Sequence, residues 1–132
     1  MAWVVDVSVL LDIHLDDPTF GNRSGQTLRR YLLDGLVICP VSCIELAPAF
    51  SGDSILQQAF LQQAGVDWLQ PWTFLDTAAS YQLWAKHIAR KRANNGSKRP
   101  VADILIEGFA QRFQGIITRN PRHFSSVAII VP

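Results

Sequence analysis

Residues 2–7 read AWVVDV, a short and almost continuous apolar run that is broken only by Asp6. This pattern is typical of a strand that is buried on both faces, as strands of parallel sheets are. Short apolar runs recur at 36–39, 66–69, 115–118 and 128–131. Strands that alternate with helices need crossover connections, so the pattern predicts an α/β protein with three layers, α/β/α, around a mostly parallel central sheet of four to five strands.

Helices are expected between these strands, over about 8–16, 22–34, 42–48, 53–64, 73–94 and 100–113. Asn22 or Ser24 would cap the second of these helices, and Gly35 would end it. Pro100 suits the first turn of the last helix. No linker or internal repeat interrupts the pattern, and residues 1–132 are therefore predicted to form one domain.

Composition narrows the class of protein further. Hydrophobic residues make up 48% of the chain and charged residues 17%, which is too apolar for a disordered chain. The two cysteines, Cys39 and Cys43, are too few for a zinc site and are expected to be buried, reduced thiols. The apolar N-terminus has no basic segment, and no run reaches the length of a membrane span. We therefore expect a cytoplasmic protein that does not enter a membrane.

The basic residues are unevenly distributed, although the net charge is only +1. The stretch from Thr77 to Ala102 contains no acid and holds half of the basic residues, namely Lys86, Arg90, Lys91, Arg92, Lys98 and Arg99. Such a run is either a solvated helix end or a surface that faces phosphate groups, and the sequence alone leaves both interpretations open.

Acidic residues follow or precede the expected strands at places where ligands gather in α/β sheets, beyond the carboxyl ends of the strands. Asp6 ends the first strand, and Glu45 is expected in the first turn of the helix after the second strand. Asp103 lies near the start of the helix that precedes the fourth strand, with Glu107 one turn further on the same face. Each acid alone has an ordinary structural explanation, such as a helix cap, a surface residue or a salt-bridge partner. Their convergence favours a functional site.

Four short motifs occur in an order that resembles the PIN-domain family. Val4–Leu11 (VVDVSVLL) is similar to the opening motif of that family, and Ser42–Leu46 (SCIEL) is similar to the second. Val101–Ile106 (VADILI) resembles the third motif, and Thr118–Phe124 (TRNPRHF) resembles the closing segment. The resemblance is strongest to the VapC-like toxins of type II toxin–antitoxin systems, and it implies a PIN-like version of the α/β/α fold.

The resemblance implies a metal-dependent endoribonuclease. Asp6, Glu45 and Asp103 would be the catalytic acids, with Asp6 and Asp103 as ligands of Mg²⁺ or Mn²⁺, and cleavage would leave a 5′-phosphate and a 3′-hydroxyl. General chemistry agrees, because clustered carboxylates repel one another without a cation and hard oxygen ligands select Mg²⁺ or Mn²⁺. A divalent cation can activate water and stabilise the charge that develops on a phosphodiester.

Four further residues are secondary candidates for the site. Glu107 could supply a fourth carboxylate. Asn120 stands where relatives often carry Asp, and its amide can orient a water or coordinate weakly. Ser8 and Thr118 could hold water or phosphate, or could serve as a helix cap and a turn residue.

The resemblance also predicts partners. RNA would be the substrate, with Arg90, Lys91, Arg92, Lys98 and Arg99 as candidate phosphate contacts. A homodimer is expected, together with a cognate antitoxin protein that blocks the acidic groove, for instance by inserting an arginine. The alternative is a degenerate PIN-type domain that binds RNA or a protein without cleavage, an interpretation that Asn120 keeps open.

Overall fold

The structure, a computed structural model, describes residues 1–94 and 101–132. The strands are β1 (Trp3–Val5), β2 (Leu36–Val37), β3 (Val66–Asp67), β4 (Gly115–Ile117) and β5 (Ile129–Ile130). The helices are α1 (Val7–His14), α2 (Gly21–Tyr31), α3 (Pro40–Glu45), α4 (Ser54–Gln63), α5 (Phe74–Asn94) and α6 (Val101–Ala110). Short 3₁₀ helices are η1 (Leu32–Asp34), η2 (Ala47–Phe50) and η3 (Pro121–His123).

The strands form one five-stranded sheet in the order β3-β2-β1-β4-β5, and every pair is parallel. Val4 of β1 lies in register with Val37 on one side and with Ile116 on the other, so the first strand is the centre of the sheet. The chain first builds outward from β1 to β3 and then returns to the other side of β1. The predicted α/β class with a mostly parallel sheet is therefore confirmed.

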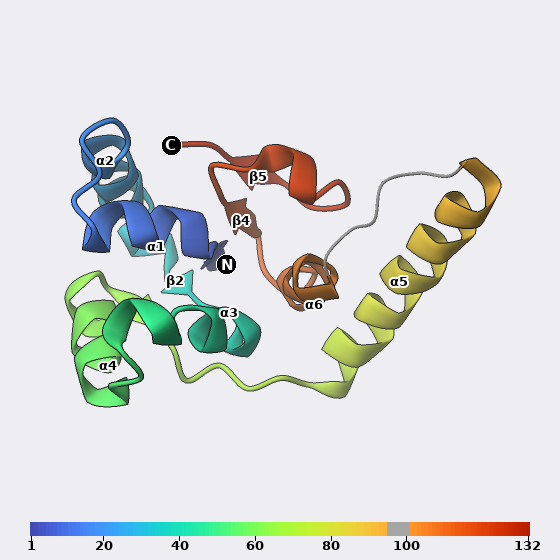
Figure 1. The fold of residues 1–132 in the computed structure, drawn as a ribbon, viewed down its shortest axis with the longest axis horizontal. Helices are drawn as coiled ribbons and strands as arrows, with labels where there is room; N and C mark the ends of the chain where they lie inside the picture. The colour runs from blue at the N-terminus through green and yellow to red at the C-terminus, as the bar shows by residue number, and fades with distance from the viewer. Residues whose placement is uncertain (95–100) are drawn as a thin grey trace.

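Helices cover both faces of the sheet, as the continuous apolar strands require. Val5 packs in a core with residues of α1, α2 and α4, whereas Val4 packs in a second core with Phe109 of α6. Figure 1 shows α1, α2 and α4 on one side of the sheet, and α6 with α5 outside it on the other. This arrangement is consistent with the expected three layers.

The contact between α5 and α6 is close at Gly108. A Cβ atom at this position would lie 1.9 Å from the Ser80 hydroxyl and 2.9 Å from the Ser80 backbone nitrogen, so only glycine lets the helices approach this closely. An ion pair also connects α5 to the segment after α6. Arg112 donates to both carboxylate oxygens of the fully buried Asp76, at 2.6 and 2.9 Å. These contacts fix the position of α6, the helix that carries Asp103.

Some predicted boundaries were wrong. The helix expected over 42–48 begins two residues earlier, because Pro40 lies in the first turn of α3, where its missing N–H costs nothing. Neither Asn22 nor Ser24 caps α2, which begins at Gly21. Ser24 is instead buried and donates to Asp12. The last predicted helix ends at Ala110, earlier than expected, and the position of Pro100 lies outside the described residues.

The two cysteines are free thiols; Cys39 is buried as predicted, whereas Cys43 is only half-buried. Burial raises the pKa of Cys39 to about 12 and also raises the pKa of Cys43, so both thiols stay protonated at neutral pH. Among the described residues, no helix has the length and apolar character that crossing a membrane requires.

Candidate active site at the carboxyl edge of the sheet

Asp6 lies between β1 and α1, and its side chain is only 8% exposed. One carboxylate oxygen, Oδ2, accepts hydrogen bonds from the Ser8 hydroxyl at 2.9 Å and from the Thr118 hydroxyl at 2.7 Å. No residue that the structure describes donates a hydrogen bond to the other oxygen, Oδ1. The carboxylate is therefore held through one oxygen, while the other remains available to a ligand.

The contact between Asp6 and Thr118 marks a special place in the sheet. Asp6 follows β1 and Thr118 follows β4, and these neighbouring strands are the pair at which the order of the sheet reverses. In open α/β sheets such a reversal leaves a crevice beyond the carboxyl ends of the strands, because the crossovers leave in opposite directions. Asp6 is thus at the position where this architecture usually places a ligand.

Glu45 is the last residue of α3 and is exposed. The prediction placed it in the first turn, and this was wrong because α3 already begins at Pro40. Partial burial raises the pKa of Glu45, and the negative charges of Asp6 and Asp103 raise it further. Asp6 and Asp103 are distant from Glu45 in the sequence, yet the fold brings both near enough for their charges to act on its carboxyl.

Asp103 is the third residue of α6, as predicted, and its side chain is 15% exposed. Its Oδ2 lies 3.2 Å from Nδ1 of His123, in the 3₁₀ helix that follows β4. The three histidines are scattered along the sequence, which therefore gives no sign that His123 belongs to the site. The fold brings this imidazole to one of the three acids.

The side chains of this site have the chemistry that a divalent cation requires, but they do not lie close enough together to hold one. Carboxylate oxygens are the ligands that Mg²⁺ and Mn²⁺ prefer, and Oδ1 of Asp6 is not used by a hydrogen bond from the described residues. However, residues 1–94 and 101–132 contain no group of three or more His, Cys, Asp or Glu side chains that could hold a metal ion as they stand. A cation would have to draw the carboxylates closer together.

The two predicted hydroxyl residues, Ser8 and Thr118, contact the Asp6 carboxylate directly. Ser8 and Thr118 both donate to Asp6, and Thr118 Oγ1 in turn accepts from the backbone N–H of Asn120 at 2.9 Å. The Ser8 hydroxyl accepts from the backbone N–H of Arg119 at 3.2 Å. These two hydroxyls therefore orient Asp6 and connect it to the loop that follows β4.

Glu107 lies on α6 with Asp103 but is fully buried. Its Oε2 accepts hydrogen bonds from the backbone N–H of Ser126 at 3.0 Å and from the Ser126 hydroxyl. In this arrangement Glu107 holds the segment that leads into β5, which gives the residue a structural role.

Sequence reasoning missed a buried ion pair beneath the loop after β4. Asp12 of α1 is 3% exposed, and its Oδ2 accepts from Arg119 Nε at 2.5 Å and from the Ser24 hydroxyl at 2.9 Å. The Arg119 guanidinium also lies over the ring of Phe20, 4.3 Å from its centre. Asp12 interrupts an apolar run, as Asp6 does, and this was the available signal.

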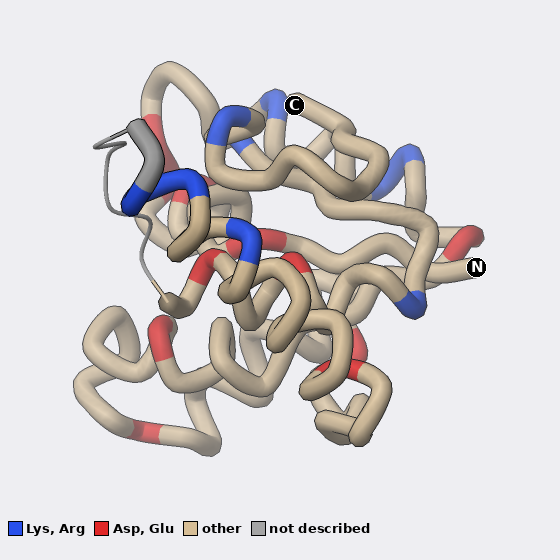
Figure 2. The backbone as a smooth tube through the Cα atoms, turned by 90° about the vertical axis from the view of Figure 1, so that its right-hand side faces the viewer, with Lys and Arg blue, Asp and Glu red and all other residues tan. Residues whose placement is uncertain are grey.

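The predicted basic segment is only partly described. Arg90, Lys91 and Arg92 are exposed at the C-terminal end of α5, and Figure 2 shows Lys and Arg positions leading to the grey trace. Lys98 and Arg99 lie outside the described residues.

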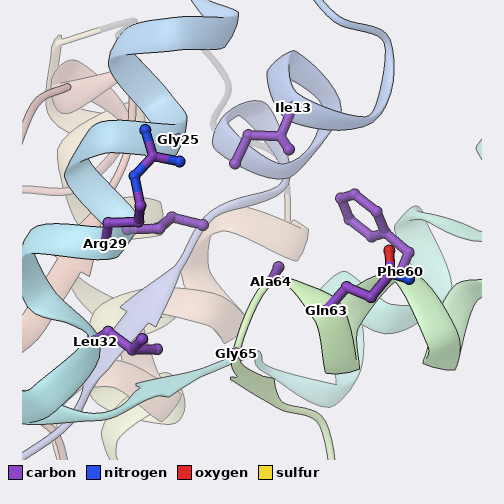
Figure 3. Close-up of a pocket in the computed structure, with 9 residues that line it drawn as sticks. Ile13, Gly25, Arg29, Leu32, Phe60, Gln63, Ala64 and Gly65 are labelled. Atoms are coloured by element: carbon purple, nitrogen blue, oxygen red, sulfur yellow. The ribbon is translucent and has the colours of Figure 1, made fainter.

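A separate hollow of about 330 Å³ lies at the opposite edge of the sheet (Figure 3). Its lining includes Ile13, Leu28 and Phe60, and it reaches Leu32 and Gly65, which precede β2 and β3. None of the residues that line it is acidic. This hollow is therefore distinct from the three acids, which lie where strands end.

No protein-family model matches this chain, and no curated protein matches it either. A relation to PIN-domain proteins therefore rests on the four sequence motifs.

We expect Glu45→Gln to stabilise the metal-free protein at neutral pH. The folded protein raises the pKa of Glu45 above its ordinary value of 4.5, so the native state holds this proton more tightly than the unfolded chain does. Ionisation of Glu45 therefore costs stability as the pH rises through the range just above 4.5. Urea unfolding should show little difference between the two proteins below that range and a more stable Gln variant above it. A difference between the two proteins that stays constant across the range would contradict this prediction.

Proposed function

We propose that this chain is a PIN-type ribonuclease that depends on Mg²⁺ or Mn²⁺ and acts as the toxin of a toxin–antitoxin pair. The observation that carries the proposal is the Asp6 carboxylate, which Ser8 and Thr118 hold through one oxygen at the carboxyl ends of β1 and β4. The negative charges of Asp6 and Asp103 also help to raise the pKa of Glu45. The position of Asp6 at the reversal of the strand order supports it. RNA as the substrate implies a location in the cytoplasm.

The proposed roles of the residues follow from their contacts. Ser8 and Thr118 fix one oxygen of Asp6 and leave the other to bind the cation. Glu45 is exposed and has a raised pKa, so it is suited to hold a proton or to accept one from water at the edge of the site. Asp103, on α6, is the third acid of the proposed site. A bound Mg²⁺ or Mn²⁺ would neutralise the repulsion between the acids, favour ionisation of water and stabilise the developing charge on the phosphate.

Incubation of the purified chain with a mixture of structured RNAs tests the function. We expect defined fragments with 5′-phosphates when Mg²⁺ or Mn²⁺ is present, and intact RNA when a chelator is added. Intact RNA under all of these conditions would count against the proposal.

One observation favours a second candidate, a domain that binds RNA or a protein without cleavage. In the part of the chain that the structure describes, no three metal-ligating side chains lie close enough together to hold an ion, and Asp103 contacts His123. RNA binding that is equally strong with and without Mg²⁺, and that leads to no product, would identify this function.

We also propose a homodimer, formed through α5. Phe74, Ala78, Tyr81 and Ala85 are all exposed and follow helical spacing, so they form one uncharged stripe on this helix. Phe74 is 80% exposed and Tyr81 is 71% exposed. Exposure of two large aromatic side chains on one helix face is unfavourable in water and is typical of an interface. A second copy can cover the stripe with its own, since a twofold interface is self-complementary.

Light scattering at micromolar concentration should report twice the mass of the chain. Phe74→Ser combined with Tyr81→Ser should shift the protein to the monomer, whereas Leu33→Ser should leave the dimer intact because Leu33 is exposed outside α5. A monomeric wild type would exclude the dimer. A cognate antitoxin remains a further proposed partner, expected to block the acids.

A further inference from the structure

The loop that follows β4 forms a shallow hollow near Asp6 and Asp103. Residues 119–123 line this hollow, whose volume is about 270 Å³. The residue before it, Thr118, donates to Asp6, and its last residue, His123, contacts Asp103. The hollow therefore adjoins two of the three carboxylates.

The two arginines of this hollow differ in their contacts. The charge of Arg119 is balanced by Asp12, and its guanidinium lies against Phe20. Arg122 is exposed and forms no hydrogen bond or ion pair with any residue in the described ranges. Arg122 thus carries an unbalanced positive charge in a loop that contacts Asp6 through Thr118 and Asp103 through His123.

A second polar group accompanies this charge. The Asn120 side chain is exposed and forms no hydrogen bond within the described part of the chain, and it does not cap the 3₁₀ helix η3. Its backbone is held on both sides, because its N–H donates to Thr118 Oγ1 and its carbonyl accepts from the N–H of His123. Phe124, which is buried, anchors the end of the loop. The backbone is fixed, while the amide and the guanidinium are available to a ligand.

An RNA strand that approaches three carboxylates is repelled by them, and a cation bound between the acids offsets this repulsion only for the phosphate that it contacts. A guanidinium in the adjoining loop offsets the repulsion for a neighbouring phosphate. Arginine suits this task, since its planar group can contact two phosphate oxygens at once.

We propose that Arg122, assisted by the Asn120 amide, forms a subsite for an RNA backbone phosphate next to the phosphodiester that is cleaved. The subsite rests on the proposed ribonuclease function. It differs from the basic end of α5, where Arg90, Lys91 and Arg92 belong to another element.

The test measures binding of a fluorescein-labelled single-stranded RNA of ten nucleotides by fluorescence anisotropy, in an Asp103→Asn background that prevents cleavage. Arg122→Ala should weaken binding about tenfold and lower the salt dependence by about one counterion, because one phosphate contact is lost. The RNA affinity of Arg122→Lys should fall between that of Arg122 and that of Arg122→Ala, because lysine keeps the charge but loses the paired contact. Arg29→Ala is the matched control, since Arg29 is an exposed arginine at the opposite edge of the sheet, and it should change affinity less than about twofold.

Equal affinities of the Arg122→Ala and Arg29→Ala variants would overturn the subsite, even if the wild type cleaves RNA. If the wild type fails to cleave RNA but Arg122→Ala still weakens binding and Arg29→Ala does not, the subsite stands and only the ribonuclease function fails.

Discussion

Asp6→Asn should lower the rate of RNA cleavage by about 1,000-fold or more, which corresponds to about 4 kcal/mol in the activation free energy. The amide keeps the shape of the side chain and can still accept from Ser8 and Thr118, but it removes the negative charge that attracts a cation. Glu45→Gln and Asp103→Asn should have effects of similar size, because each removes one of the three converging charges.

Asp67→Asn is the matched control for these variants. Asp67 ends β3 at the same edge of the sheet, but its carboxylate accepts from Leu69 and Gln70 in its own turn. The cleavage rate of Asp67→Asn should stay within about twofold of the wild-type rate. Circular dichroism should show that the three site variants and this control are folded. Cleavage at a near-normal rate by two of the three site variants would place the chemistry elsewhere.

Asp12→Ala should have the largest effect on stability, a loss of about 3 kcal/mol in the free energy of unfolding. The substitution leaves the partly buried Arg119 guanidinium without its carboxylate and the buried Ser24 hydroxyl without its acceptor. The loop after β4 should loosen as well, because Arg119 also donates its backbone N–H to Ser8.

Urea denaturation measures this loss, with Asp34→Ala as the control. Asp34 is an exposed acid at the end of a 3₁₀ helix, and its removal should cost less than about 0.5 kcal/mol. A cost for Asp12→Ala no larger than that of Asp34→Ala would mean that the buried ion pair does not stabilise the fold.

The sequence predicted the sheet well because its strands are buried on both faces. A continuous apolar run such as AWVVDV has few alternative structures, and Asp6 at its end is costly unless it serves a purpose. Helix starts were harder to predict. Pro40 suits both the end of a strand and the first turn of a helix. Because α3 begins at Pro40 and not at residue 42, Glu45 lies at the end of α3 and not in its first turn.

Contacts between distant parts of the chain could not be predicted. Asp12 and Arg119 are separated by most of the sequence and form a pair only because β1 and β4 are neighbours in the sheet. Asp103 and His123 meet within the consecutive elements α6, β4 and η3. Glu107 shows the limit of helical spacing, which placed it one turn from Asp103 but could not reveal that its carboxylate holds Ser126.

The central claim is that Asp6 and Asp103 bind a hard divalent cation beside Glu45, and calorimetric titration with Mn²⁺ tests it most directly. The wild type should bind Mn²⁺, the Asp6→Asn and Asp103→Asn variants should bind it at least about tenfold more weakly, a difference of about 1.4 kcal/mol, and Asp67→Asn should match the wild type. Binding that is absent from the wild type, or equal in all four proteins, would contradict the claim.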